Sequence, residues 1–113
     1  MAFQKTLSLP NGASGDYITI GPYLLDPMTR TLSAHFHLYF SAALRASNPS
    51  DPLRPIVAKL RLSGAVFDSY LSTAALAEVE SDDPVRSQIY AAAKVQPVES
   101  DFGPAVFADA VDV

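Results

Sequence analysis

The chain has 113 residues, of which 49% are hydrophobic and 18% are charged, and it contains no cysteine. This length and composition are typical of one globular domain with a single core, and the missing cysteines exclude disulfides and thiolate metal sites. Its 8 basic and 12 acidic residues give a net charge of −4. Residues 97–113 hold four of the acids and no Lys or Arg, so residues 1–96 are neutral, with 8 of each sign.

This charge distribution argues against two classes of partner. A neutral body lacks the basic surface of a nucleic-acid binder, and an acidic tail repels phosphate and anionic lipid. The first residues have no apolar segment typical of a signal peptide, and no apolar stretch approaches the roughly 20 residues of a membrane helix. We therefore expect no nucleic-acid partner and no membrane partner, and a protein that is soluble where it is made.

Alternating apolar residues predict strands through the first half of the chain. A first strand is expected at residues 3–9, followed by a turn at 10–15. Residues 16–25 and 30–43 predict a long antiparallel hairpin around the Asp26-Pro27 turn, and Pro22 predicts an edge or a bulge. The expected inward residues are Ile18, Ile20, Leu24, Leu32, Ala34, Phe36, Leu38 and Phe40.

The second half predicts one more strand and then helices. Residues 46–55 contain three prolines and are expected to form an irregular loop. Residues 56–63 predict a strand in which Lys59 and Arg61 point outward and Ile56, Ala58, Leu60 and Leu62 point inward. Short helices are expected at 66–71 and 74–79. A longer helix is expected at 84–95, where an Asp cap precedes Pro84.

The element order predicts an α+β fold: an antiparallel sheet of about four strands, two or three short helices and an extended C-terminal arm. Residues 1–96 are expected to form the domain, and residues 97–113 the arm. The arm combines its acids with six large apolar side chains, which a disordered tail rarely carries. We expect it to dock on its own core or on a neighbouring subunit. The six are Val98, Phe102, Val106, Phe107, Val111 and Val113.

Candidate chemical motifs are few. His35 and His37 share one strand face and could supply two zinc ligands, but no third ligand accompanies them. Asp82-Asp83 is better explained as a helix cap than as a catalytic pair. Gly12-Ala13-Ser14-Gly15 lacks the spacing of a nucleophile elbow. With no paired nucleophile and base, the sequence predicts a protein that is not an enzyme and that binds no metal or cofactor.

The sequence predicts surfaces for protein–protein contact more strongly than it predicts a catalytic or metal site. Tyr17, Tyr23 and Tyr39 are expected to share the outer sheet face with His35 and His37, as a contact patch or as a layer that the helices cover. Lys59 and Arg61 are expected either to face solvent or to receive the acidic arm of a neighbouring copy. The arm would add four apolar contact residues, which are Phe102, Val106, Phe107 and Val111.

Several segments resemble a set of small structural proteins of tailed bacteriophages. The resemblance lies in residues 1–12 (MAFQKTLSLPNG), 63–70 (SGAVFDSY) and 91–94 (AAAK), and in the C-terminal residues 100–103 and 106–113. It spans most of the chain and brings no catalytic residues with it. It implies a virion protein made in the host cytoplasm, homo-oligomeric and in contact with other virion proteins.

No sequence feature encodes the position within the particle, and a tail or baseplate position is our first choice. A capsid-decoration or head–tail joining role is the second choice. A different class of function also fits the acidic arm, namely a small intracellular regulatory module that binds a host protein.

Overall fold

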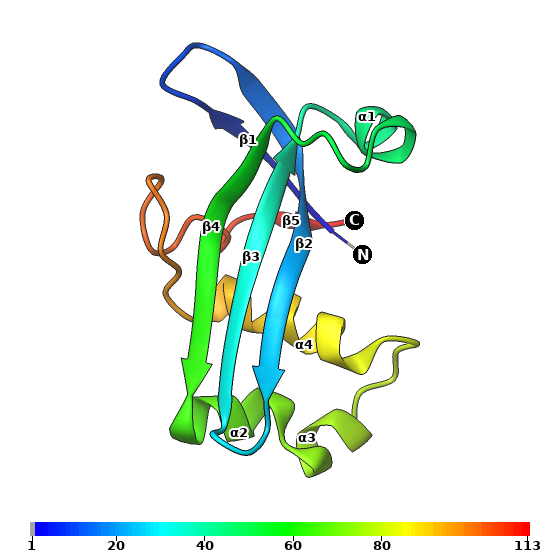
Figure 1. Cartoon of the computed structure of the whole chain (residues 1–113), viewed down its shortest axis with the longest axis vertical. Coiled ribbons are helices and arrows are strands. Elements are labelled where there is room, and N and C mark those ends of the chain that lie inside the picture. The colour runs from blue at the N-terminus through cyan, green and yellow to red at the C-terminus, as the bar shows by residue number, and fades with distance from the viewer. Residues whose placement is uncertain (1) are drawn as a thin grey trace.

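The computed structural model describes residues 2–113 and has the expected α+β class, with an antiparallel sheet in the order β4-β3-β2-β1-β5 (Figure 1). About four strands were expected, and the fifth comes from the C-terminal segment. The strands are β1 (Phe3–Ser8), β2 (Ser14–Asp26), β3 (Thr31–Tyr39), β4 (Arg54–Ser63) and β5 (Val111–Asp112). The helices are α1 (Ala42–Ser47), α2 (Gly64–Leu71), α3 (Thr73–Ala77) and α4 (Pro84–Val95).

The core lies between the sheet and α2 and α4, and the sheet face turned to it is called the inner face. Four aromatic rings meet at its centre: Phe107 lies 5.0 Å, between ring centroids, from both Phe3 and Phe36, and Tyr90 of α4 lies 5.0 Å from Phe3. Aliphatic side chains of the inner face and the helices surround the rings. The buried ones include Ile18, Ile20, Leu38, Leu60, Leu62, Phe67, Leu71 and Ile89.

A β-bulge in β2 confirms the expectation for Pro22 and corrects two others. Ile20 lies opposite Phe36 and Tyr23 lies opposite Ala34, so β2 has one residue more than β3 between these pairs. An extra residue reverses the alternation beyond it. Leu24, expected inward, is therefore 72% exposed, and Tyr23 shares the inner side with Ala34 instead of joining the outer tyrosines.

The upper end of the sheet departs from the expected pattern for a related reason. Phe36 pairs with Ala58 but Leu38 pairs with Arg54, so β4 carries extra residues between these pairs. As a result Val57 is buried, and Ile56, expected inward, is 41% exposed. Phe40, also expected inward, is 59% exposed because β3 ends at Tyr39 and the chain turns into α1.

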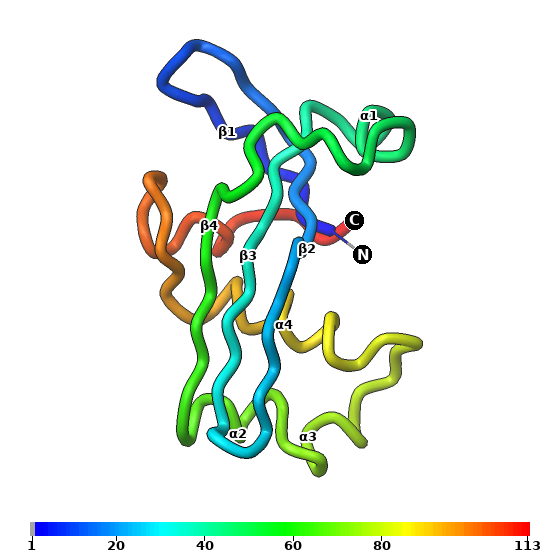
Figure 2. The backbone as a smooth tube through the Cα atoms, viewed as in Figure 1, coloured from blue at the N-terminus to red at the C-terminus, as the bar shows by residue number. Residues whose placement is uncertain are grey.

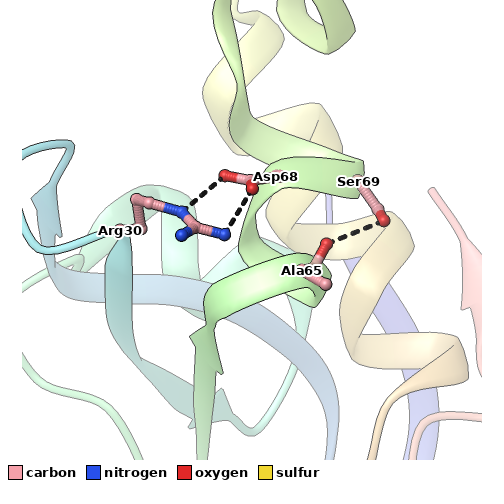
Figure 3. A network of polar contacts seen from close by, with 4 residues as sticks. All are labelled: Arg30, Ala65, Asp68 and Ser69. Atoms are coloured by element: carbon pink, nitrogen blue, oxygen red, sulfur yellow. Dashed lines mark hydrogen bonds and ion pairs between the residues drawn. The ribbon is translucent and has the colours of Figure 1, made fainter.

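The helix boundaries follow from local capping. α4 begins as expected, with an Asp83 carboxylate oxygen accepting from the Arg86 amide and Pro84 in the first turn. Ser72 caps α3 in the same way, through the Ala75 amide. α2 is tied to the β2–β3 hairpin turn, where the Arg30 guanidinium donates twice to the Asp68 carboxylate, at 3.1 and 2.5 Å (Figure 3). This paired contact raises the pKa of Arg30.

Candidate functional site

The C-terminal segment (residues 97–113) binds both edges of the sheet of its own chain. At one edge, the backbone amides and carbonyls of Glu99 and Lys59 form two hydrogen bonds of 2.8 and 2.9 Å. The segment then crosses behind the sheet, and at the far edge β5 pairs with β1 (Figure 2). There Ala2 and Val113 exchange two backbone hydrogen bonds of 3.0 Å, which brings the two ends of the chain side by side.

Most large apolar side chains of this segment enter the core. Phe107 is fully buried, and Val98 and Val106 are 5% and 4% exposed. Phe102 is half-buried and packs against the core, whereas Val111 is 59% exposed. The structure therefore places the expected contact residues Val106 and Phe107 inside their own chain, where no partner can reach them in this conformation.

Every acid of the segment forms an ion pair with a basic residue of the body. The four pairs are Glu99–Arg61 at 3.9 Å, Asp101–Arg54 at 2.6 Å, Asp109–Lys5 at 2.6 Å and Asp112–Lys94 at 3.4 Å. The Lys5 ammonium also lowers the pKa of Asp109, through a hydrogen bond and its charge. Arg61, expected to face solvent or to receive the arm of another copy, is 65% exposed and pairs with Glu99 of its own chain.

The outer sheet face carries four of the five expected aromatic and imidazole residues. Cross-strand partners point to the same side, and Tyr17 faces Tyr39, Thr19 faces His37, and His35 faces Lys59. Tyr23 does not belong to this set. Within residues 2–113 no group of three or more His, Cys, Asp or Glu could hold a metal ion.

Part of this face is covered by α1 and the loop that follows it. Tyr39 is only 3% exposed, because its hydroxyl donates to the Pro49 carbonyl at 2.5 Å and the Arg45 guanidinium lies 5.6 Å from its ring centroid. His37 contacts the Pro55 carbonyl through Nδ1. The outer face is therefore covered at its upper end, around Tyr39 and His37, by α1 and the loop that follows it.

The most exposed apolar surface near α1 was not expected from the sequence. Phe40, Leu44 and Leu53, here called the apolar end, are 59%, 44% and 37% exposed and line a hollow of about 330 Å³. α1 itself buries no side chain. A signal for this helix was present: Ser41 is a favourable N-cap and is followed by helix-forming Ala, Leu and Arg residues.

A second hollow, of about 450 Å³, lies beside the β2 edge between α1 and the start of α4. Six polar residues line it, and it is called the α1–α4 groove: Tyr17, Thr19, Arg45, Asp83, Arg86 and Tyr90. The Tyr90 hydroxyl accepts from the Ile20 amide at 2.8 Å, and burial raises its pKa. This hydroxyl therefore keeps its proton at neutral pH and remains a donor.

Comparison with protein-family models, curated proteins and solved structures found no match to this chain. Among residues 2–113, no helix is long and apolar enough to cross a membrane.

Proposed function

We propose that this protein is a non-enzymatic structural subunit of a bacteriophage particle, placed in the tail or baseplate and assembled through protein–protein contacts. One observation carries the proposal: the apolar end exposes Phe40, Leu44 and Leu53 around a single hollow. A cluster of exposed large apolar side chains on a small domain is typical of a contact surface. The resemblance to phage structural proteins supplies the particle as the place of contact.

The local structure at the apolar end supports a role in assembly. α1 has six residues and buries none of them, and a helix this short is marginal unless something packs on it. A partner seated on Phe40 and Leu44 would give the helix that packing. The same contact would remove the apolar side chains from water.

A second copy of this chain is the partner that the shape favours. The molecule is 42 Å long, and the β2–β3 hairpin turn lies at the end opposite to α1 (Figure 1). This turn also exposes apolar groups, with Met28 93% and Leu24 72% accessible. Contact between one copy's hairpin turn and the next copy's apolar end joins unlike surfaces, and such contacts repeat into rings or tubes.

The place of the protein in the particle is tested by mass spectrometry of purified virions, followed by the same measurement on separated tails and heads. We expect stoichiometric amounts in intact particles and in tails. Presence in heads alone would move the role to capsid decoration. Absence from particles would contradict the proposal and favour the host-binding alternative.

The contact itself is tested by light scattering during size-exclusion chromatography. Replacing Phe40 and Leu53 together with Ser should shift assemblies toward monomer, since it removes the apolar end. The matched control is Val95→Ser, because Val95 is an exposed apolar residue too, at 72%, but lies at the end of α4 and away from the apolar end. Equal loss of assembly in both variants, or no loss in either, would exclude the apolar end as the contact.

A further inference from the structure

The basic residues of the chain differ in whether they form an ion pair. Of its eight Lys and Arg residues, six form ion pairs. Among residues 2–113, Arg45 and Lys59 are the two without an acidic partner. Lys59 is half-buried on an edge strand, whereas Arg45 belongs to the α1–α4 groove.

Arg45 has one buried hydrogen-bond donor, its Nε, that lacks an acceptor within residues 2–113. Its side chain lies against the Tyr39 ring, and its Nε is buried with no hydrogen-bond partner in the part of the chain that the structure describes. A buried guanidinium N–H that lacks an acceptor costs free energy, about 1–3 kcal/mol for an uncharged donor and more for a charged one. Such a group is therefore best explained by an acceptor that arrives from outside.

Other donors line the same groove. Within the described residues, the hydroxyls of Tyr17 and Thr19 have no hydrogen-bond partner, although Thr19 is 7% exposed. The Tyr90 hydroxyl accepts from Ile20 and therefore has its own hydrogen to donate. The groove thus combines a guanidinium with three hydroxyl donors.

The acid in the groove is already engaged. Asp83 accepts from the Arg86 amide at 3.2 Å to cap α4 and lies 3.6 Å from the Arg86 guanidinium. Its charge is offset by Arg86 and by the positive end of the helix dipole. The charge of Arg45 has no counterpart, so the groove as a whole carries an excess positive charge.

We propose that the α1–α4 groove binds an oxyanion, the carboxylate or phosphate group of a small ligand, with Arg45 as its principal donor and Tyr17 and Thr19 as hydroxyl donors. The planar guanidinium suits the paired oxygens of both groups. The volume of about 450 Å³ accommodates such a group and the small molecule that carries it. This inference does not depend on the proposed structural role.

The test is titration of the ¹⁵N-labelled protein with inorganic phosphate in one series and acetate in another, at constant ionic strength, followed by amide chemical shifts. We expect saturable shifts at residues 17–20 and 45, and the series with the tighter binding identifies the group. Arg45→Gln should weaken binding about tenfold or more, the usual effect of losing a charge-assisted hydrogen bond. Lys59→Gln removes the other unpaired cation and should leave the affinity unchanged.

Shifts that stay linear with concentration, or equal affinity in Arg45→Gln and wild type, would overturn the site. Equal loss in Lys59→Gln would show general charge attraction and would also overturn it. If Arg45→Gln does not fold, Tyr17→Phe replaces it, because the Tyr17 hydroxyl forms no hydrogen bond within the described residues and its loss should leave the fold intact. Binding several-fold weaker supports the site, and unchanged binding would overturn it as proposed. Particle composition is unaffected by either outcome, so this test and that of the proposed function fail separately.

Discussion

Residues 97–113 and residues 40–55 both contain proline, and both carry large apolar side chains. The two segments differ in how far their apolar side chains are buried. In the first, Phe107 is fully buried and Val106 is 4% exposed, while in the second Phe40 is 59% and Leu44 is 44% exposed. Composition therefore does not distinguish a segment that completes the core from one that leaves apolar groups open.

The difference lies in where each segment meets the sheet. Residues 97–113 cross the inner face and form backbone hydrogen bonds with β4 and β1 at its two edges. Residues 40–55 fold over the upper end of the outer face and are attached through polar contacts such as Tyr39 with Pro49. Most large apolar groups of the first segment reach the core, whereas Phe40, Leu44 and Leu53 of the second reach solvent or a partner.

The largest expected effect is from removing residues 97–113. A chain that ends at Gln96 lacks β5, the Phe107 ring and the cover over one region of the inner face. We expect a loss on the order of the whole stability of a small domain, about 5–15 kcal/mol. Circular dichroism during heating should show no cooperative transition. A sharp transition near that of the full chain would mean that the segment is not part of the core.

A single substitution in each segment sharpens the comparison. Phe107→Ala should cost about 3–5 kcal/mol of unfolding free energy, because it leaves a cavity between Phe3 and Phe36. Phe40→Ala, the matched control, should change stability by no more than about 0.5 kcal/mol. Urea unfolding monitored by circular dichroism measures both. Similar costs would place the two rings in equivalent surroundings and contradict the structure.

The junction between the upper loop and the sheet is tested at Gly15. A Cβ added there would lie 2.6 Å from the Tyr39 carbonyl oxygen and 3.1 Å from a Leu53 methyl carbon. Because the oxygen belongs to the backbone, Gly15→Ala should destabilise the protein by about 1–3 kcal/mol. Urea unfolding measures the change, with the exposed neighbour Ser14→Ala as control. Equal stability of the two variants would show that this contact is loose.

The smallest expected effect concerns the acids of the C-terminal segment. The hydrogen bond and charge of Lys5 make the pKa of Asp109 lower in the folded chain than in the unfolded chain. The ion pair therefore stabilises the fold fully at pH values above the ordinary pKa of Asp. The contribution is lost as the pH falls through the lowered value. Asp109→Asn should therefore flatten part of the acid-induced loss of stability, measured by urea unfolding from pH 6 to pH 3.

The control for this effect is Asp51→Asn, in the upper loop, since Asp51 has no ion pair among residues 2–113. It should leave the acid dependence of stability unchanged. An Asp109→Asn variant with the acid dependence of the wild type would show that Lys5 does not stabilise the folded carboxylate. High salt should reduce the difference, because the Asp109 side chain is 76% exposed.

Much of the fold was predictable because its signals are local. The β2–β3 hairpin, the bulge at Pro22 and the Asp83 cap depend on neighbouring residues, and all three are found. The inward positions of Leu24, Ile56 and Phe40 were wrong because an alternating pattern does not register irregularities: Leu24 follows a bulge, Ile56 lies within one, and Phe40 follows the end of β3. Propensity alone could have indicated α1, but the proline-rich stretch after it favoured a loop.

The candidate sites were less predictable because they depend on distant contacts. Tyr17, Arg45 and Arg86 come from a strand and two helices, and they meet only because α1 and α4 approach the same edge of β2. The burial of Phe107 likewise depends on a strand pairing between the two ends of the chain. No spacing within the sequence encodes these distances.

The pairing of β1 with β5 also determines when the protein can fold during its synthesis. Lys5 and Asp109 are 104 positions apart, and the Phe3 ring meets Phe107 across a similar separation. While the ribosome is extending the chain, the hairpin can form and α2 and α4 can pack on it, but the region that Phe107 covers stays open until residues 97–113 emerge. Because loops this long close late and slowly, we expect the nascent chain to expose this apolar region to chaperones until residues 97–113 have emerged.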